Sequence, residues 1–171
     1  MKPLFAPFTV KQICVIGVMA CLVLLGTMIL RLPVSAYGYI HLGDALIYVF
    51  AVYWGKRYGA LAGAFGACLA DILSGYAFMA PSTFVIKFAM GFAVGRLADK
   101  RRNVFKNIFA VAIGALIMLA GYFITMLIIT GNLYTAFFGE TVWDFAQAVG
   151  GVAMYLALGT VIFRLRLYNH I

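Results

Sequence analysis

Apolar residues fill six stretches of the chain, and short segments that contain glycine, proline or charged residues separate them. A helix needs about 20 predominantly apolar residues to cross a bilayer. We place six helices near residues 10–30, 43–55, 58–75, 82–98, 107–130 and 143–164. The pattern predicts an all-α integral membrane protein, a bundle of six transmembrane helices that forms a single membrane domain over residues 1–171.

The composition changes this picture little, but it excludes several classes of protein. Of the 171 residues, 65% are hydrophobic and 11% are charged, whereas soluble domains carry about 25% charged residues. We therefore expect membrane lipid around the chain, and no nucleic-acid partner despite the net charge of +8. Cys14, Cys21 and Cys68 lie in apolar runs and behave as small membrane-embedded side chains. We expect neither a metal site nor a cofactor.

The basic residues define the orientation of the predicted bundle. Six spans bring eleven of the 13 basic residues to one side of the membrane: Lys2, Lys11, Lys56, Arg57, Arg96, Lys100, Arg101, Arg102, Lys106, Arg164 and Arg166. Cytoplasmic loops carry an excess of lysine and arginine. This distribution predicts that both termini are cytoplasmic, as in a multi-pass protein of the bacterial plasma membrane.

Most of the acidic residues fall at the opposite, outer side. Asp44, Asp71, Glu140 and Asp144 map to outer helix ends or to the connection before the last helix. Lys87 lies inside the predicted helix 82–98, where a lone ammonium costs about 3 kcal/mol or more. We expect Lys87 to share an outward-opening polar chamber with these acids. Two interpretations remain open for Lys87: an ion pair with Asp71, or a contact with a ligand.

The three outer connections are rich in aromatic and hydrogen-bonding residues. They supply as candidate ligand-binding residues Tyr39, His41, Asp44, Tyr76, Asn132, Asp144 and Gln147. The first connection, residues 31–45, contains glycine hinges and is typical of a lid over a ligand. The alternatives are a surface histidine and an aromatic belt at the membrane interface, as for Tyr134 and Trp143.

Small residues indicate where helices approach one another. Gly59, Gly63 and Ala67 recur every four residues, and such spacing lets membrane helices pack closely. The first helix also carries small residues, namely Gly17, Ala20 and Cys21. Its small-residue face either packs inside the bundle or docks on another membrane subunit.

The chain lacks the motifs of an energy-coupling or hydrolytic protein. It contains no GxxxxGK[ST] phosphate-binding loop, no HExxH and no GxSxG. It also lacks the inverted repeat that supports alternating access in many transporters. These properties suggest a subunit that binds a small molecule and relies on partners for energy.

Residues 38–95 closely resemble the substrate-binding S components of energy-coupling factor (ECF) vitamin transporters. The resemblance is strongest in the runs HLGDA, YGALAG and ADILSGY and in the spaced run from Ala80 to Gly91. Within that family the chain looks most like the members assigned to hydroxymethylpyrimidine or pyridoxine. Riboflavin-type members are more distant.

The resemblance implies a six-helix subunit, not an enzyme, that captures a vitamin with high affinity near the extracellular face. It implies as partners a transmembrane T component and two ATPase subunits, which bind the ATP. The family docks through an AxxxA motif in its first helix, and here Gly17 and Cys21 occupy that position. A pyrimidine or pyridine ring would stack on Tyr39, Tyr76 or Tyr122 and bond to polar groups that include Lys87.

Other functions compete with this interpretation. One is an S component for another vitamin, such as riboflavin. A second is a small membrane enzyme that uses His41, Asp44 and Asp71 as general acids and bases. A third is a structural membrane subunit whose charges only pair with each other.

Overall fold

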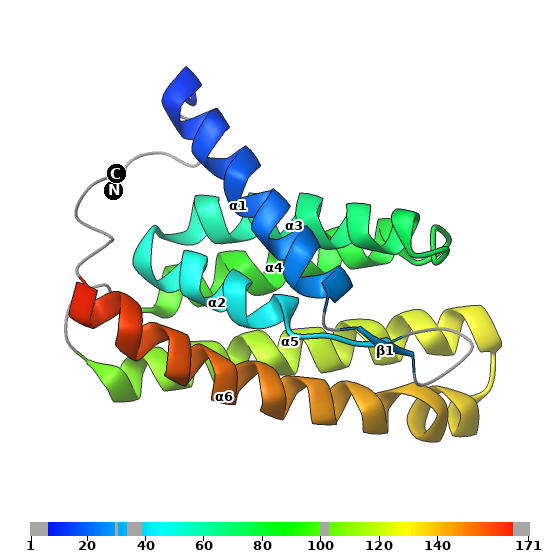
Figure 1. Cartoon of the computed structure of the whole chain (residues 1–171). Helices are drawn as coiled ribbons and strands as arrows, with labels where there is room; N and C mark the ends of the chain where they lie inside the picture. The colour runs from blue at the N-terminus through cyan, green and yellow to red at the C-terminus, as the bar shows by residue number, and fades with distance from the viewer. Residues whose placement is uncertain (1–6, 30, 34–38, 100–102, 166–171) are drawn as a thin grey trace.

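The computed structural model describes residues 7–29, 31–33, 39–99 and 103–165, and most of them are helical (Figure 1). The six long helices are α1 (Val10–Ile29), α2 (Gly43–Tyr53), α3 (Lys56–Leu73), α4 (Ala80–Leu97), α5 (Val104–Thr130) and α6 (Val142–Leu165). Each begins and ends within three residues of the bounds expected from the sequence. The basic residues Lys2, Lys100, Arg101, Arg102 and Arg166 lie outside the described residues.

Two elements differ from the expected plain loops. After α1, the chain forms a short antiparallel hairpin of β1 (Leu32–Pro33) and β2 (Tyr39–Ile40). After α5, which ends at Gly131 in the left-handed conformation (φ 62°), a π-helix η1 (Thr135–Thr141) leads directly into α6. Glycine adopts this conformation without the penalty that a Cβ would bring.

Helix α2 lies at the centre of the bundle and is nearly enclosed. Nine of its 11 residues are buried, and it contacts α1, α3, α4 and α6. At 1.5 Å per residue it is about 16 Å long, roughly half of the hydrocarbon thickness. Helix α2 therefore lies in the bundle as a core element that other helices shield from the surroundings.

In the described part of the chain, three helical segments are long and apolar enough to cross a membrane. They are α1, α5 and the segment Thr135–Thr160, which joins η1 to α6. Helices α3 and α4 have 18 residues each, and their glycine, alanine and polar residues lower their hydropathy. The protein is thus a helical membrane protein, and the six-span topology stays a prediction.

Close packing of α3 on its neighbours explains its stripe of small residues. A Cβ on Gly59 would lie 2.5 to 2.8 Å from Ala51 of α2, and one on Gly91 would lie 2.5 Å from the Gly59 carbonyl oxygen. Gly63 faces Ile47 of α2 in the same way. Side chains at these positions would push the helices apart. The prediction that small residues serve packing inside the bundle is confirmed for α3 and α4.

The small residues of α1 divide between two faces. Gly17 has no atom within 4 Å of the place a Cβ would take, and Cys21 is exposed. Ala20 is buried, and its carbonyl oxygen lies 2.5 Å from a Cβ built on Gly66 of α3. Ala20 therefore packs inside the bundle, which corrects its assignment to a docking face.

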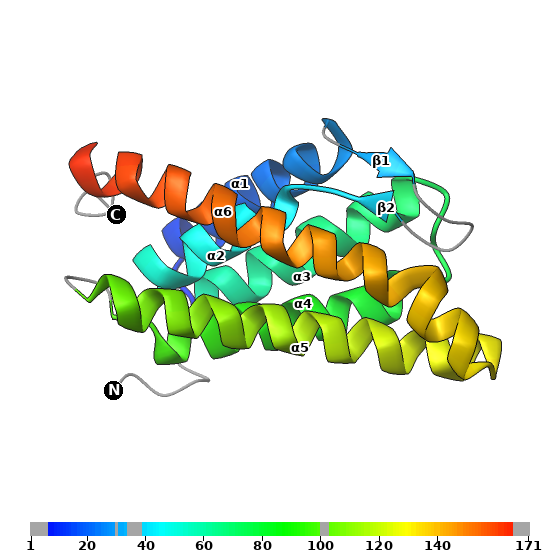
Figure 2. The same cartoon turned by 90° about the horizontal axis from the view of Figure 1, so that it is seen from below.

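The two ends of the bundle differ in charge. Figures 1 and 2 both show α2, α4 and α6 ending at the end where α3 and α5 begin. Lys56, Arg57, Arg96 and Lys106 lie in these terminal turns, so we call this the basic end. The hairpin and η1 lie toward the opposite end, the hairpin end.

Candidate ligand-binding site

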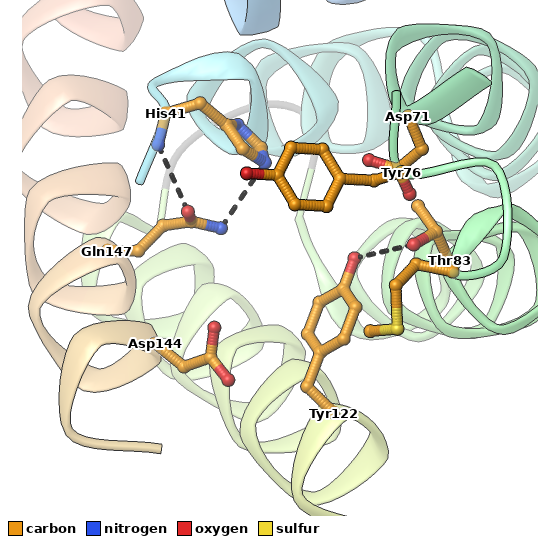
Figure 3. A pocket seen from close by; sticks show the side chains of 8 residues that line it. His41, Asp71, Tyr76, Thr83, Tyr122, Asp144 and Gln147 are labelled. Carbon is orange, nitrogen blue, oxygen red and sulfur yellow. Dashed lines mark hydrogen bonds between the residues drawn. The ribbon is translucent and has the colours of Figure 1, made fainter. Parts of the chain in front are cut away.

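A cavity lies toward the hairpin end of the bundle, between α3, α4, α5 and α6 (Figure 3). Its lining consists of His41, Asp71, Tyr76, Met79, Thr83, Tyr122, Asp144 and Gln147. Its volume is about 40 Å³, which is room for a few waters. Ligand pockets usually measure about 300 Å³ or more. A vitamin therefore enters only if lining groups move apart.

Lys87 is paired with a different acid from the one the sequence suggested. Its Nζ atom lies 2.5 Å from Oδ1 of Asp44, and both side chains are buried. Asp71, the expected partner, lines the cavity instead. Asp44 belongs to the first turn of α2, where the helix dipole favours a negative charge. Packing of α2 on α4 brings this turn to Lys87.

Gln147 completes the surroundings of Asp44. Its Nε2 donates to Oδ2 of Asp44 at 2.8 Å, and its Oε1 accepts the backbone N–H of His41 at 3.1 Å. A buried ion pair is tolerated when further hydrogen bonds satisfy its remaining lone pairs. We call Lys87, Asp44, Gln147 and His41 the buried network. It joins α2, α4 and α6 to the segment that follows β2.

The tautomer of His41 follows from its contacts. The Nδ1 atom accepts the backbone N–H of Gly43 at 3.1 Å, so in the neutral ring the proton resides on Nε2. Burial lowers the pKa of His41 from 6.5 to about 4, the Asp44 carboxylate opposes this shift, and the Lys87 ammonium adds to it. His41 is therefore neutral at pH 7.

Gly43 allows this arrangement because it has no side chain. A Cβ there would collide with Oγ1 of Thr27 and would lie 3.2 Å from Nδ1 of His41. The glycine of the HLGDA run thus lets α1 and the His41 ring close over the start of α2. A larger residue would collide with Thr27 and press on the His41 ring.

Tyr122 borders both the cavity and the ion pair. Its ring centroid lies 5.2 Å from Nζ of Lys87, a distance at which a cation is attracted to an aromatic face. Its hydroxyl donates to Oγ1 of Thr83 at 3.2 Å. The ring therefore contributes both to the cavity wall and to the surroundings of Lys87.

Six of the ten residues that the sequence suggested for ligand binding line the cavity. They are His41, Asp71, Tyr76, Tyr122, Asp144 and Gln147. Asp44 and Lys87 lie behind the wall in the buried network. Both carboxylate oxygens of Asp44 are engaged, Oδ1 by Lys87 and Oδ2 by Gln147.

The remaining two candidates lie elsewhere. Asn132 is exposed, and its Oδ1 accepts the backbone N–H groups of Tyr134 and Thr135 at 2.9 and 3.3 Å. It caps the turn into η1 and does not line the cavity. Tyr39 pairs with Pro33 through the hairpin backbone, and its side chain lies outside the described part of the structure.

Two lining residues, Met79 and Thr83, were not among the candidates. Met79 lies eight residues and Thr83 four residues before Lys87, a spacing that places residues on one helix face. The helical periodicity, counted back from Lys87, could therefore have predicted that these two residues lie in the cavity lining. Thr83 is buried, with 2% of its surface exposed.

The cavity offers chemistry for binding a flat polar molecule. The rings of Tyr76 and Tyr122 provide stacking surfaces, and the carboxylates of Asp71 and Asp144 accept hydrogen bonds. Among the described residues, no group of three or more metal-ligating side chains occurs. The lining thus matches a binding site for an organic ligand.

Comparison with known proteins identifies the family. The sequence model described as the S component of an ECF-type riboflavin transporter matches residues 7–167. A protein of Pyrococcus woesei, described as an uncharacterized protein in the gap 3′ region, is 32% identical over 139 residues. The match covers 80% of this chain and 90% of that protein.

The family match agrees with the architecture and the cavity. Its members are transporter subunits rather than enzymes, and they act in vitamin transport with T and ATPase subunits. The apolar helices of the chain fit a multi-pass membrane protein of this kind. This protein belongs to the family of S components of ECF-type riboflavin transporters.

Proposed function

We propose that this protein captures a small vitamin or vitamin precursor at the outer face of the membrane for an ECF-type importer. The observation that carries the proposal is the cavity, in which two tyrosines and two aspartates converge at the end opposite the basic residues. Hydroxymethylpyrimidine and pyridoxine are the preferred ligands, because each is a small flat ring with several hydrogen-bonding groups. Riboflavin is the alternative that the family name favours.

We further propose that the basic end faces the cytoplasm. Lys56, Arg57, Arg96 and Lys106 are at this end, and the positive-inside rule places such clusters on the cytoplasmic side of the plasma membrane. The cavity then opens outward and both termini are cytoplasmic. All six helices would cross the membrane, with short α2 shielded by its neighbours.

Docking of the T component is proposed for the face of α1 that contains Gly17 and Cys21. This face is exposed and has room for a closely packed helix. Gly17→Phe should abolish vitamin uptake in cells that supply the T component and both ATPases, while the purified variant binds vitamin normally. Leu22→Phe is the matched control, because Leu22 is exposed on α1 about 140° around the helix from Gly17.

Binding of the vitamin is tested directly with the purified chain. Native mass spectrometry identifies a co-purifying molecule, and thermal shifts with hydroxymethylpyrimidine, pyridoxine and riboflavin rank the candidates, because a ligand that binds the native state stabilises it. Asp71→Asn and Asp144→Asn should each weaken binding about tenfold or more, since hydrogen bonds to charged groups contribute about 1.5–3 kcal/mol.

Asn132→Ala is the control for these two variants, because Asn132 is polar, close to the hairpin end and outside the cavity lining. It should bind the ligand as the unmodified protein does. Normal affinity in both aspartate variants would contradict the assignment of the cavity as the binding site. Absence of stabilisation by every vitamin in the panel would contradict the proposed function.

A further inference from the structure

On the basis of the function proposed above, we infer that the cavity extends, when ligand binds, into an apolar subsite formed by Met79, Met126 and Ala136. We call these three residues the methionine subsite, and it takes the alkyl edge of the vitamin ring. All three candidate vitamins have such an edge, because hydroxymethylpyrimidine and pyridoxine each carry one ring methyl group and riboflavin carries two. The ring then enters with its methyl groups toward α5 and η1.

The cavity has to widen before it can hold any of these rings. Its volume is about 40 Å³, whereas ligand pockets usually measure about 300 Å³ or more. Hydrogen bonds hold much of the lining in place, because Gln147 accepts the backbone N–H of His41 and Tyr122 donates to Thr83 (Figure 3). Movement of these groups would leave buried polar atoms without partners, which is costly.

Met79 is the part of the wall that can move without this cost. It is the one lining residue with an aliphatic side chain, and it packs with Met126 of α5 and Ala136 of η1 in a buried cluster. Methionine is unbranched and has three rotatable bonds, so it adapts its shape to its surroundings. Two neighbouring methionines therefore form a wall that can change shape and keep its apolar contacts.

The cover over this cluster is thin. The cluster is separate from the main hydrophobic core. Ala136 is the one buried residue among the described residues 131–138, and its neighbours Phe137 and Phe138 are exposed. The π-helix η1 thus packs against the bundle at this point through one small side chain, and little buried apolar area is lost when the contact loosens. Such helices are rare and are frequent at functional sites.

The ring of Tyr122 joins the cavity to the methionine subsite, because it lines the first and packs against the second. A flat ligand stacked on Tyr122 therefore reaches from the polar lining groups to the methionine side chains. Alkyl groups gain dispersion contacts with thioether and methyl groups. A hydroxyl or amine there would lose its water without gaining a partner. The alkyl edge is thus the part of the ring that suits the subsite.

The first measurement compares each vitamin with the analogue that lacks its ring methyl groups. The pairs are riboflavin and 7,8-didemethylriboflavin, pyridoxine and 2-norpyridoxine, and hydroxymethylpyrimidine and its 2-demethyl form. Dissociation constants are measured by calorimetry with the purified full chain in detergent at pH 7. Burial of one such group contributes about 0.8 kcal/mol, so we expect each lost methyl group to weaken binding about fourfold.

Two variants link this preference to the subsite. Met126 belongs to the cluster but does not line the cavity, so Met126→Ala leaves space into which Met79 can move. A homologue with an ethyl group in place of the methyl group should therefore gain about tenfold in affinity relative to the methyl form, because the overpacking is relieved. Met79→Ala should give the same gain by enlarging the cavity directly.

Met90→Ala is the matched control. Met90 is a fully buried methionine of α4 that belongs to the main core and does not line the cavity. Its truncation should lower the melting temperature but leave the ratio of ethyl to methyl affinities unchanged. The melting temperature without ligand shows that each variant is folded, and if one subsite variant does not fold, the other decides.

The outcomes separate the methionine subsite from the proposed function. Equal affinities for the methylated and demethylated forms would overturn the subsite, and so would an ethyl-to-methyl ratio that rises in neither subsite variant or rises equally in Met90→Ala. In each of these cases the vitamin still binds, and the function as a vitamin-binding subunit stands. If none of the three vitamins binds, the proposed function is overturned and the subsite with it.

Discussion

Two polar regions of this membrane protein, the buried network and the cavity, share His41 and Gln147 and both border the Tyr122 ring, but they differ in the charged groups that they contain. In the buried network, Lys87 and Asp44 are matched one to one, and Gln147 occupies the second carboxylate oxygen. The cavity, by contrast, presents two carboxylates and no lysine or arginine among its described lining residues. The first region thus contains a matched ion pair, whereas the second places two carboxylates beside two tyrosine rings in a cavity.

This difference assigns separate roles to residues that look equivalent in the sequence. Asp44 and Asp71 are both aspartates in terminal turns of helices, Asp44 in the first turn of α2 and Asp71 in the last turn of α3. Asp44 holds a lysine and a glutamine in place and so fixes α2, α4 and α6 relative to each other. Asp71 lies in the cavity wall. Substitutions in the buried network should lower the stability of the fold, whereas substitutions in the cavity wall should lower the affinity for the ligand.

The largest expected effect follows from breaking the ion pair. Lys87→Met leaves the Asp44 carboxylate buried without its cation, which costs about 3–5 kcal/mol. We expect a marked fall in the melting temperature of the purified protein in detergent. Lys87→Met/Asp44→Asn should recover most of the loss, because no charge remains buried. A single variant as stable as the unmodified protein would show that the pair is not structural.

Acidification should open the network at His41. Because the pKa of His41 is lowered to about 4 in the folded protein, the unfolded state binds the proton more readily. The contribution of neutral His41 to the free energy of unfolding is complete above pH 6.5. It is lost as the pH falls toward 4, and the total loss is about 3 kcal/mol. Melting temperatures from pH 7 to 4 should fall less steeply for His41→Gln. Parallel curves for the two proteins would contradict the burial of a neutral histidine.

Gln147 tests the boundary between the regions, since it belongs to both. Gln147→Leu removes the donor to Asp44 and the acceptor for the His41 N–H, and an unsatisfied buried group costs about 1–3 kcal/mol. We expect lower stability together with weaker vitamin binding. Val149→Leu is the control, because Val149 is an exposed neighbour on α6. Ala148 is buried and so cannot serve this purpose. Loss of affinity without loss of stability would place Gln147 in the cavity alone.

The smallest effect is expected at the Tyr122 hydroxyl. Tyr122→Phe removes the hydrogen bond to Thr83, worth about 0.5–1.5 kcal/mol, but keeps the ring beside Lys87. Tyr122→Leu removes the ring as well and should lower the melting temperature further. Equal losses in the two variants would mean that the ring adds nothing beyond its hydroxyl.

The sequence predicted the helices well because apolar length and glycine breaks are local properties. The bounds of α2 and α5, for example, follow from such breaks at Gly55 and Gly131. The hairpin was missed because its strands have only two residues each, too few for a periodic pattern. Likewise, η1 continues into α6 through a segment that reads as a loop.

The site was predicted in part. The segregation of acids away from the basic end pointed to Asp71 and Asp144, and the polar first connection pointed to His41; all three line the cavity. The partner of Lys87 was not predictable, because it depends on how α2 and α4 pack against each other. Ala20 illustrates the same limit, since the rotation of α1 decides which small residues face α3.

The central claim is that Lys87 stabilises the bundle through Asp44 and does not touch the ligand. The most direct test is the dissociation constant of the captured vitamin for the Lys87→Met/Asp44→Asn double variant, measured by calorimetry on folded protein. In this variant the asparagine oxygen still accepts the Gln147 amide, so the cavity wall is preserved. We predict an affinity within about threefold of the unmodified protein, less than 1 kcal/mol. A loss of tenfold or more with an unchanged melting temperature would show that the lysine contacts the ligand and would contradict the account.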